Sequence, residues 1–287
     1  MGTVGFVGLG LMGRGFTQRL AEKGHRVVGF DIDDEKVRAA AAWGVAPAAS
    51  AADVAEVADV LLVCVINTAA VEDVTTGPRG FTAAPNLTDK ICVDVSTTEL
   101  DSTKRIANAL RSRGADFVDA PVSGGPGAAK TGTLAIMAGG SDAAIATIRP
   151  LMRDLGSFTH MGEVGTGQAT KLVNQTIVLT NYCVLAEALR LAQAYGVDAA
   201  KIPEALKSGF AGSNMLGPIF PQMLSDDFKP RGFARQVLKD LEMLQAAARD
   251  KHVAMPMASQ ALTLYRLLNA SGKAELDAAS VVSLYPR

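Results

Sequence analysis

The spacing of apolar residues changes along this chain, and the change divides it into two parts. In the first part, short apolar runs alternate with helical segments; the predicted strands cover residues 3–7, 26–30, 59–65, 91–95, 116–120, 133–138 and 158–161, with a short strand near residue 45. This alternation is typical of a parallel sheet with helices on both faces. Beyond residue 196 the spacing becomes helical, and the predicted helices cover 199–208, 220–224, 233–251, 257–270 and 274–285. We therefore expect an α/β domain over residues 1–162 and an all-helical domain over residues 163–287.

One long helix is expected to join the two parts, after three glycines within residues 162–167. No charged residue occurs from Leu172 to Ala186, and the apolar residues there point to nearly every side of a helix, so we expect burial on most faces. Polar residues such as Asn174 and Thr180 interrupt the run and argue against a membrane span. A helix of roughly 30 residues would be about 45 Å long, which is enough to cross a small domain.

A glycine-rich motif follows the first predicted strand. It consists of Gly8, Leu9, Gly10, Leu11, Met12 and Gly13. Between a strand and a helix, this G-x-G-x-x-G spacing is typical of a dinucleotide-binding loop: the glycines allow a tight turn, close approach of a pyrophosphate and close helix–strand packing. The helix N-terminus adds N–H groups and a positive dipole end. The motif predicts a Rossmann-type doubly wound sheet; the alternative is a glycine-rich turn in another α/β protein.

Asp31 ends the second predicted strand, 18 residues after Gly13. A carboxylate at this place accepts hydrogen bonds from both hydroxyls of the adenosine ribose and repels a 2′-phosphate, so we predict NAD in preference to NADP. The alternative is that Asp31 caps the next helix, and it could also do both.

Two further loops follow predicted strands, where ligands bind in sheets of this kind. The hydroxyls of Ser96, Thr97 and Thr98 could contact cofactor or substrate, or they could cap the next helix. Residues 121–127 read Pro-Val-Ser-Gly-Gly-Pro-Gly and are predicted to be a loop. Its backbone N–H groups and the Ser123 hydroxyl would form a cradle for a carboxylate, with a purely structural turn as the alternative.

Lys171 stands just before the uncharged stretch of the long helix. Asn174 and Gln175 follow at three and four residues, on the same helix face. Lysine can donate a proton, and burial lowers the pKa of a lysine toward neutrality, so Lys171 is a candidate acid and base; the alternative is a solvated lysine. Lys239 and Asp240 lie in a charged patch of an apolar helix, and either reach the site or form a surface ion-pair cluster.

Composition and charge exclude several functions. The 287 residues carry a net charge of −1, so no broad basic face for nucleic acid is expected. Cys64, Cys92 and Cys183 are far apart in apolar runs, and the three histidines lack the spacing of metal ligands, so we expect neither disulfides nor a metal. No signal peptide is visible, and we expect a cytoplasmic protein.

Taken together, the motifs resemble those of the β-hydroxyacid dehydrogenases, a family that includes 3-hydroxyisobutyrate dehydrogenase and tartronate semialdehyde reductase. The resemblance covers essentially the whole chain and rests on GFVGLGLMG at 5–13, DAPVSGG at 119–125, GTGQATKLVNQ at 165–175 and KDL at 239–241. It implies reversible hydride transfer between a nicotinamide cofactor and a small hydroxycarboxylate, which becomes a semialdehyde or keto acid.

The resemblance also implies roles for matching residues. Lys171 would be the catalytic acid and base. The residues that would bind substrate are Ser123, Gly124 and Gly125, at its carboxylate, together with Asn174 and Gln175. Besides the glycine loop and Asp31, the residues that would contact the cofactor are Cys64, Val65, Ile66, Thr97 and Lys239.

The chain departs from many family members at two places. It has Gly15-Phe16 in place of Pro-Met, and Cys64-Val65 in place of Leu-Pro, which leaves the subgroup open. Residues 63–67 and the final Tyr-Pro pair look more like the threonate dehydrogenase branch. Related imine reductases lack the lysine, so its presence argues against that activity, and also against a non-catalytic dehydrogenase-like assembly module. The helical domain is expected to line the substrate pocket and to form a homodimer or homotetramer.

Overall fold

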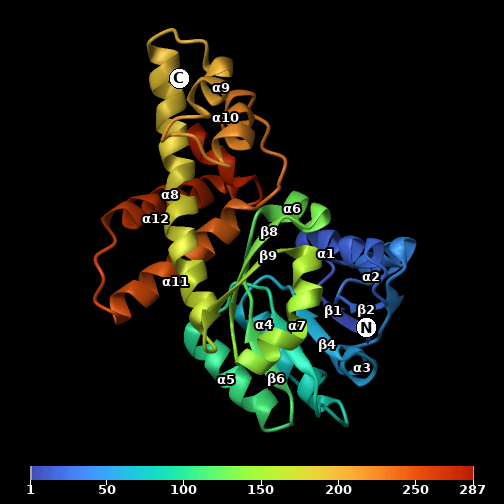
Figure 1. Cartoon of the computed structure of the whole chain (residues 1–287). Coiled ribbons are helices and arrows are strands. Elements are labelled where there is room, and N and C mark those ends of the chain that lie inside the picture. The colour runs from blue at the N-terminus through green and yellow to red at the C-terminus, as the bar shows by residue number, and fades with distance from the viewer. Residues whose placement is uncertain (1, 287) are drawn as a thin grey trace. The chain divides into compact units, whose positions relative to one another are not determined.

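The computed structural model describes residues 2–286, and the chain folds into two compact units, Met1–Lys171 and Leu172–Arg287 (Figure 1). The boundary falls inside the long helix α8 (Thr166–Ala194), whereas the predicted boundary followed residue 162. The first turns of α8 belong to the first unit because the Asp119 carboxylate accepts hydrogen bonds from the N–H groups of Gly165 and Gln168.

The first unit is built on one nine-stranded sheet in the order β3-β2-β1-β4-β5-β6-β8-β7, with β9 paired to β8. The strands are β1 (Val4–Val7), β2 (Val27–Phe30), β3 (Ala46–Pro47), β4 (Val60–Val63), β5 (Ile91–Asp94), β6 (Asp116–Asp119), β7 (Val122–Ser123), β8 (Leu134–Gly139) and β9 (Gly156–Gly162). From β3 to β6 every pair is parallel, as predicted, but β8 runs antiparallel to both β6 and β7. The predicted Rossmann-type fold is confirmed, with a mixed edge.

Helices follow most of the strands of this unit. They are α1 (Leu11–Glu22), α2 (Asp34–Ala40), α3 (Ala51–Val57), α4 (Thr68–Thr76), α5 (Leu100–Arg111), α6 (Gly125–Thr131) and α7 (Asp142–Leu155), with 3₁₀ turns at Ala41–Trp43 and Phe81–Ala83. The prediction of a loop over 121–127 was wrong. Val122 and Ser123 pair with β8, and α6 begins at Gly125, with proline in its first turn where the missing N–H costs nothing.

Sequence reasoning also missed α4, although a local signal was present. The Asn67 side chain accepts a hydrogen bond from the N–H of Ala70, at 2.8 Å, and so caps the helix. Asparagine is among the preferred residues at this position. The helix therefore begins directly after the loop that follows β4.

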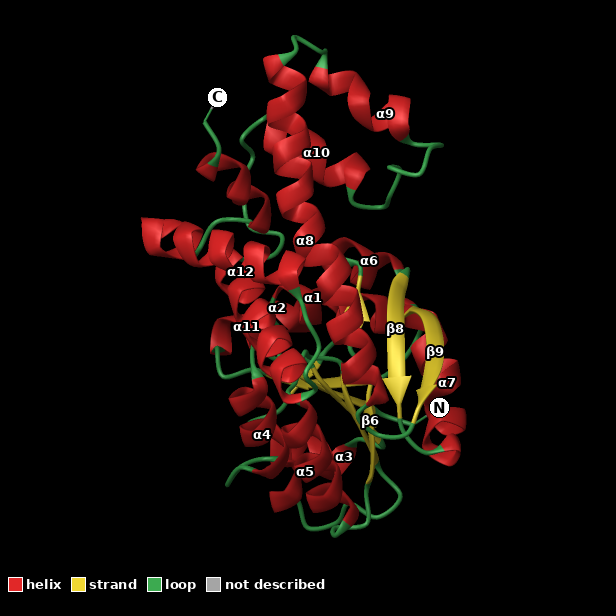
Figure 2. Cartoon of the chain, turned by 90° about the vertical axis from the view of Figure 1, so that its left-hand side faces the viewer, coloured by secondary structure: helices red, strands yellow, loops and turns green. Residues whose placement is uncertain are grey.

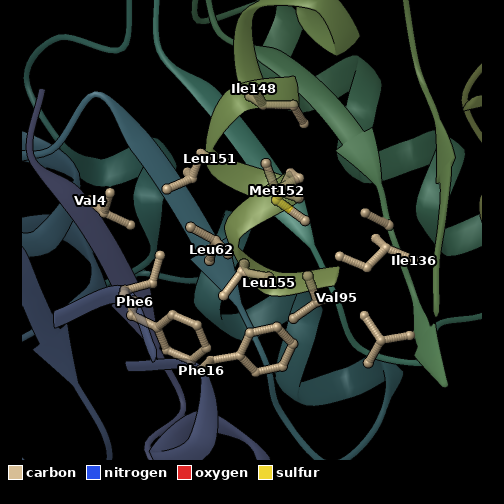
Figure 3. Packing of buried hydrophobic residues seen from close by; sticks show 14 of the residues in the cluster. Val4, Phe6, Phe16, Leu62, Val95, Ile136, Ile148, Leu151, Met152 and Leu155 are labelled. Atoms are coloured by element: carbon tan, nitrogen blue, oxygen red, sulfur yellow. The ribbon is translucent and has the colours of Figure 1, made fainter. Parts of the chain in front are cut away.

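Both faces of the sheet are buried under helices, because neighbouring residues of a strand point to opposite faces. On one face, Phe6 of β1 and Leu62 of β4 pack with Phe16 of α1 and Leu155 of α7 (Figure 3). On the other face, the adjacent Leu61 packs in a cluster with residues of α3 and α5. The covered faces leave the carboxyl ends of the strands as the place for a ligand.

The second unit is built from helices and the loops and turns that join them (Figure 2). Besides the rest of α8, it contains α9 (Ile202–Leu206), α10 (Leu216–Leu224), α11 (Ala234–Asp250) and α12 (Pro256–Leu268), a 3₁₀ turn at Ala199–Lys201, a π-type turn at Asn269–Lys273 and a 3₁₀ helix at Ala278–Leu284. Phe220 and Tyr265 are fully buried in its core, and the Tyr265 hydroxyl donates to the Ala278 carbonyl. The segment predicted as a helix at 274–285 is a 3₁₀ helix over Ala278–Leu284 and a turn before it.

The expectation that α8 is buried on most faces was wrong. Leu179, Cys183 and Ala186 lie in the core of the second unit, but Val173, Ile177 and Leu191 are about 60% exposed. The core covers one stripe of the helix and leaves another uncovered. By length and composition alone, α8 is the one helix among residues 2–286 that could cross a membrane, a test that the core helices of soluble proteins also pass.

Candidate active site

The glycine loop joins β1 to α1, and its three glycines have different surroundings. A Cβ on Gly8 would lie 2.1 Å from the Cys64 carbonyl oxygen, and one on Gly13 would lie 1.9 Å from the Gly8 carbonyl oxygen. A Cβ on Gly10 would meet nothing within 4 Å. Gly10 also stands at the N-cap of α1, and no side chain caps this helix start. The glycine loop and the first turn of α1, which contains Leu11 and Met12, are chemically suited to a dinucleotide pyrophosphate.

Asp31 braces the glycine loop from the end of β2. Its carboxylate accepts hydrogen bonds from Leu9 N, at 2.7 Å, and from Asp33 N, at 3.0 Å, and Lys36 Nζ lies 3.7 Å away. The alternative that Asp31 caps α2 is wrong, because Asp33 is the cap and accepts from Glu35 N. The buried carboxylate therefore holds the loop and lies at the strand edge where a ribose would bind.

The loops after β4 and β5 are tied together. Val65 N donates to the Ser96 hydroxyl at 3.0 Å, and the Thr98 hydroxyl donates to the Asp94 carboxylate. The alternative that these hydroxyls cap α5 is wrong for Ser96 and Thr98, because the N-cap residue is Glu99, which makes no side-chain cap. Thr97 is half-buried between them.

Cys64 and Ile66 flank Val65 in the first of these loops. Burial, together with the nearby Asp94 charge, raises the pKa of the Cys64 thiol to about 12, so the thiol stays neutral at ordinary pH. Ile66 is exposed. The loop thus presents a neutral surface, which suits the floor of a cofactor site.

The Ser123-Gly124-Gly125 segment turns from β7 into α6. Gly124 has φ +135° and Gly125 has φ +73°, which favour glycine, and Gly124 is an N-cap without a side-chain cap. A Cβ on Gly125 would meet nothing within 4 Å. An uncapped helix start beside a serine hydroxyl is chemically suited to a carboxylate.

Lys171 is 7% exposed, so the alternative of a solvated lysine is wrong. Its Nζ donates to the Val122 carbonyl oxygen at 2.7 Å, next to Ser123. The turn of α8 that precedes it is fixed by Asp119, which accepts from Gly165 N at 2.7 Å and from Gln168 N at 2.8 Å. The first unit thus brings the lysine to the proposed carboxylate cradle.

In the second unit, Asn174, Gln175, Lys239 and Asp240 form one polar cluster. Asn174 Nδ2 donates to Gln175 Oε1 at 2.8 Å, Gln175 Nε2 donates to the Asp240 carboxylate, and Lys239 Nζ lies 3.0 Å from that carboxylate. Gln175 is buried and Asp240 is nearly so, whereas a surface ion-pair cluster would be exposed. The surface interpretation therefore does not describe Asp240, whereas the Lys239 side chain is 29% exposed.

Among residues 2–286, no group of three histidine, cysteine or acidic side chains could hold a metal ion.

Comparison with known proteins finds similarity along both units. A family model described as the NAD binding domain of 6-phosphogluconate dehydrogenase matches residues 3–204, and one described as NAD-binding of NADP-dependent 3-hydroxyisobutyrate dehydrogenase matches residues 165–285. The 2-hydroxy-3-oxopropionate reductase of Escherichia coli (strain K12) is 34% identical over 284 residues, which cover 97% of this chain and 95% of the relative.

Two solved structures share the architecture of the whole chain. The 3-hydroxyisobutyrate dehydrogenase from Salmonella typhimurium has a TM-score of 0.90 at 27% identity, covering 99% of this chain and 100% of the other. Psf3, solved in complex with NADP⁺ and 2-OPP, has a TM-score of 0.91 at 26% identity, covering 98% and 99%.

Proposed function

The chain belongs to the β-hydroxyacid dehydrogenase family of oxidoreductases, and from this premise we propose that it interconverts a small β-hydroxy acid and its semialdehyde or keto acid with a nicotinamide cofactor. The observation that carries the proposal is the buried Lys171, whose Nζ is bonded to the Val122 carbonyl beside Ser123. A buried amine next to a carboxylate cradle is the arrangement that acid–base catalysis on a hydroxycarboxylate needs.

We propose that Lys171 moves the proton. In oxidation, the neutral amine takes the proton of the substrate hydroxyl; in reduction, the ammonium returns it to the carbonyl oxygen. The ammonium also stabilises negative charge as it develops on that oxygen. A bound nicotinamide would supply the hydride chemistry at the carbinol carbon, so that loss of one proton and one hydride converts the alcohol to a carbonyl.

We propose that Ser123 and the N–H groups of Gly124 and Gly125 hold the substrate carboxylate. Fixing the carboxylate would align the hydroxyl with Lys171. Asn174 lies three residues beyond Lys171 on α8 and uses one N–H toward Gln175, which leaves its amide oxygen for the substrate hydroxyl. Gln175, held by Asp240, would keep that amide oriented.

We propose the glycine loop, the loop over residues 64–66, Thr97 and Lys239 as the cofactor contacts, with NAD preferred over NADP. The support for NAD is the pair of carboxylates at the end of β2, Asp31 and Asp33, which would repel a 2′-phosphate. Lys36, 3.7 Å from Asp31 and 3.2 Å from Asp33, offsets part of this charge. Because Psf3 was solved with NADP⁺, the preference has to be measured for this chain.

We propose that the protein is a homo-oligomer, and specifically that a second copy covers α8. Val173, Ile177, Val184 and Leu191 form an exposed apolar stripe on this helix, and residues 172–186 contain no charge that a partner would have to neutralise. An uncharged apolar stripe is complementary to itself in a two-fold dimer. The three free cysteines suit a reducing compartment, and we propose the cytoplasm.

The test of the reaction is Lys171→Ala, assayed beside the wild type with NAD⁺ and NADP⁺ over hydroxy acids of three to five carbons. We expect kcat to fall by about 10²–10⁴-fold, because general acid–base catalysis is lost. Binding of NAD, followed by the change in NADH fluorescence, should be retained. Lys201→Ala is the control, because the Lys201 side chain is exposed. Near wild-type kcat in Lys171→Ala would exclude the assigned role.

A further inference from the structure

One buried amide connects the helix that carries Lys171 to the loop that follows β5. The Gln168 side chain is 1% exposed. Its Oε1 accepts from Thr98 N at 3.1 Å, and its Nε2 donates to the Ser96 carbonyl oxygen at 2.9 Å. The amide oxygen and the amide nitrogen are therefore both hydrogen-bonded, one to each of the two residues that flank Thr97. Thr98 lies 70 residues before Gln168 in the sequence.

The backbone at Gln168 is held equally tightly. Its N–H donates to the Asp119 carboxylate at 2.8 Å. A Cβ on the neighbouring Gly167 would lie 2.3 Å from the Asp119 carbonyl oxygen and 2.5 Å from that of Met137, so the helix rests directly on the ends of β6 and β8. This turn of α8 has no room to shift against the sheet.

The same connections continue to the loop after β4 and to Lys171. Val65 N donates to the Ser96 hydroxyl, which connects the loops after β4 and β5. Lys171 follows Gln168 by three residues, nearly one helical turn, and its Nζ is bonded to the Val122 carbonyl. Gln168 thus lies between the loops proposed to contact the cofactor and the proposed acid–base group.

We propose that Gln168 is a positioning residue, which keeps the Ser96–Thr98 segment, and the cofactor bound against it, in register with Lys171. This inference rests on the proposed function. Proton and hydride transfer need both partners in place at once, and a displacement of about 1 Å can cost about 10²-fold in rate. Loss of Gln168 should therefore lower kcat more than it weakens cofactor binding.

The experiment compares Gln168→Ala and Gln168→Glu with Gln193→Ala and Gln193→Glu, matched changes at an exposed position of the same helix. For Gln168→Ala we expect kcat to fall by about 10–100-fold, while the Kd for NADH changes by less than about threefold. The Gln193 variants should match the wild type.

The pH dependence of Gln168→Glu distinguishes the loss of this hydrogen bond from a general packing defect. A glutamate anion cannot donate to the Ser96 carbonyl, but a protonated glutamic acid has the shape of glutamine and restores that donor. Burial and the neighbouring Asp94 carboxylate favour the protonated form, as does Asp119 where its own carboxyl is ionised, while the Lys104 and Lys171 ammonium groups oppose it. We expect the ratio of the Gln168→Glu kcat to the wild-type kcat to rise as the pH is lowered from about 8 to about 6. The same ratio for Gln168→Ala should not change with pH.

A wild-type kcat in Gln168→Ala, or a Gln168→Glu ratio that does not rise at low pH, would overturn the positioning role. Amide exchange of Thr98, read by mass spectrometry on peptides covering residues 94–103, should be faster in Gln168→Ala than in the wild type; equal exchange would also overturn it. If the wild type itself shows no turnover that depends on Lys171, the proposed function fails and this role fails with it, an outcome distinct from the loss of this role alone.

Discussion

At the scale of single residues, Gly10 and Gly13 serve the nucleotide loop for opposite steric reasons. Gly10 has open space where a Cβ would lie and a φ of −67°, which any residue adopts, whereas Gly13 has the Gly8 carbonyl oxygen at 1.9 Å. The missing side chain of Gly10 leaves room for a ligand, whereas the missing side chain of Gly13 leaves room for the backbone of Gly8.

We predict that Gly13→Ala lowers the free energy of unfolding by about 1–3 kcal/mol, the usual cost of overpacking, and that Gly10→Ala does not. Gly10→Ala should instead weaken NADH binding at least tenfold, about 1.4 kcal/mol, because the methyl group occupies the approach of the pyrophosphate. Thermal melting and fluorescence titration measure the two effects. Gly217→Ala, also at an open position, is the control; unchanged NADH affinity in Gly10→Ala would contradict the assignment of the loop.

Asp119 gives a prediction about pH. Burial, with a smaller contribution from the Asp94 charge, raises the pKa of its carboxyl to about 7, against the hydrogen bonds from Gly165 and Gln168, which lower it. Because an unfolded aspartate titrates near about 3.9, the folded protein holds a proton that the unfolded chain has lost, and stability falls as the pH rises from that value through the folded pKa. Asp119→Asn removes the titratable carboxyl group and therefore removes its contribution to the pH dependence of stability. The Tm of the wild type, measured at several pH values between about 5 and 8, should fall more steeply than that of the variant; parallel curves would refute the assignment.

At the scale of elements, helix starts in the first unit differ in how they are capped. The side chains of Asp33, Ser50, Asn67 and Ser141 cap α2, α3, α4 and α7. The starts of α1, at Gly10, of α5, at Glu99, and of α6, at Gly124, have no side-chain cap. Of these three, we propose the starts of α1 and α6 for pyrophosphate and carboxylate, where a ligand would satisfy the N–H groups.

We therefore predict that removing a side-chain cap affects stability and not catalysis. Ser141→Ala deletes the acceptor of the Ala144 N–H and should cost about 0.5–2 kcal/mol of stability, with kcat and KM unchanged. Urea unfolding and steady-state kinetics on the same sample test this. Ser157→Ala, at an exposed position of β9, should leave both unchanged. A lowered kcat in Ser141→Ala would mean that α7 takes part in the site.

At the scale of the whole molecule, the exposed stripe on α8 predicts assembly. Ile177 is 60% exposed in the middle of the uncharged stretch. Ile177→Asp would place a charge in a buried apolar contact, and burying an unpaired charge is strongly unfavourable. We expect the wild type to be a dimer or tetramer by light scattering after size-exclusion chromatography, and Ile177→Asp to shift toward monomer.

Val57→Asp is the control for this prediction, because Val57 is an exposed apolar residue of α3 in the first unit. It should leave the assembly unchanged. A wild type that elutes only as a monomer would contradict the proposal, and an equal effect of both substitutions would point to a different contact surface.

Features that depend on neighbouring residues could be predicted from the amino-acid sequence. Strand and helix alternation, the glycine motif and Asp31 at the end of β2 were all predicted, because side-chain periodicity and glycine spacing are local properties of the chain. The family also followed from local motifs, in their order along the chain. The starts of the helices were predicted less well. For α4 a local signal was present, because the Asn67 side chain caps this helix.

Features that depend on residues far apart in the sequence became visible only in the folded chain. Val122 and Ser123 became a strand because β8 supplied the hydrogen bonds. Lys171 lies buried, and its Nζ donates a hydrogen bond to a carbonyl oxygen 49 residues away. Gln168 gained its place from Ser96 and Thr98, whose partners no local pattern reveals. The sequence of α8 does not show which side of the helix the core covers, because its apolar residues occur on nearly every side and carry no charge. The position of the exposed stripe therefore depends on the packing of the second unit. Such pairings are set by packing of the whole chain, which periodicity along one segment does not encode.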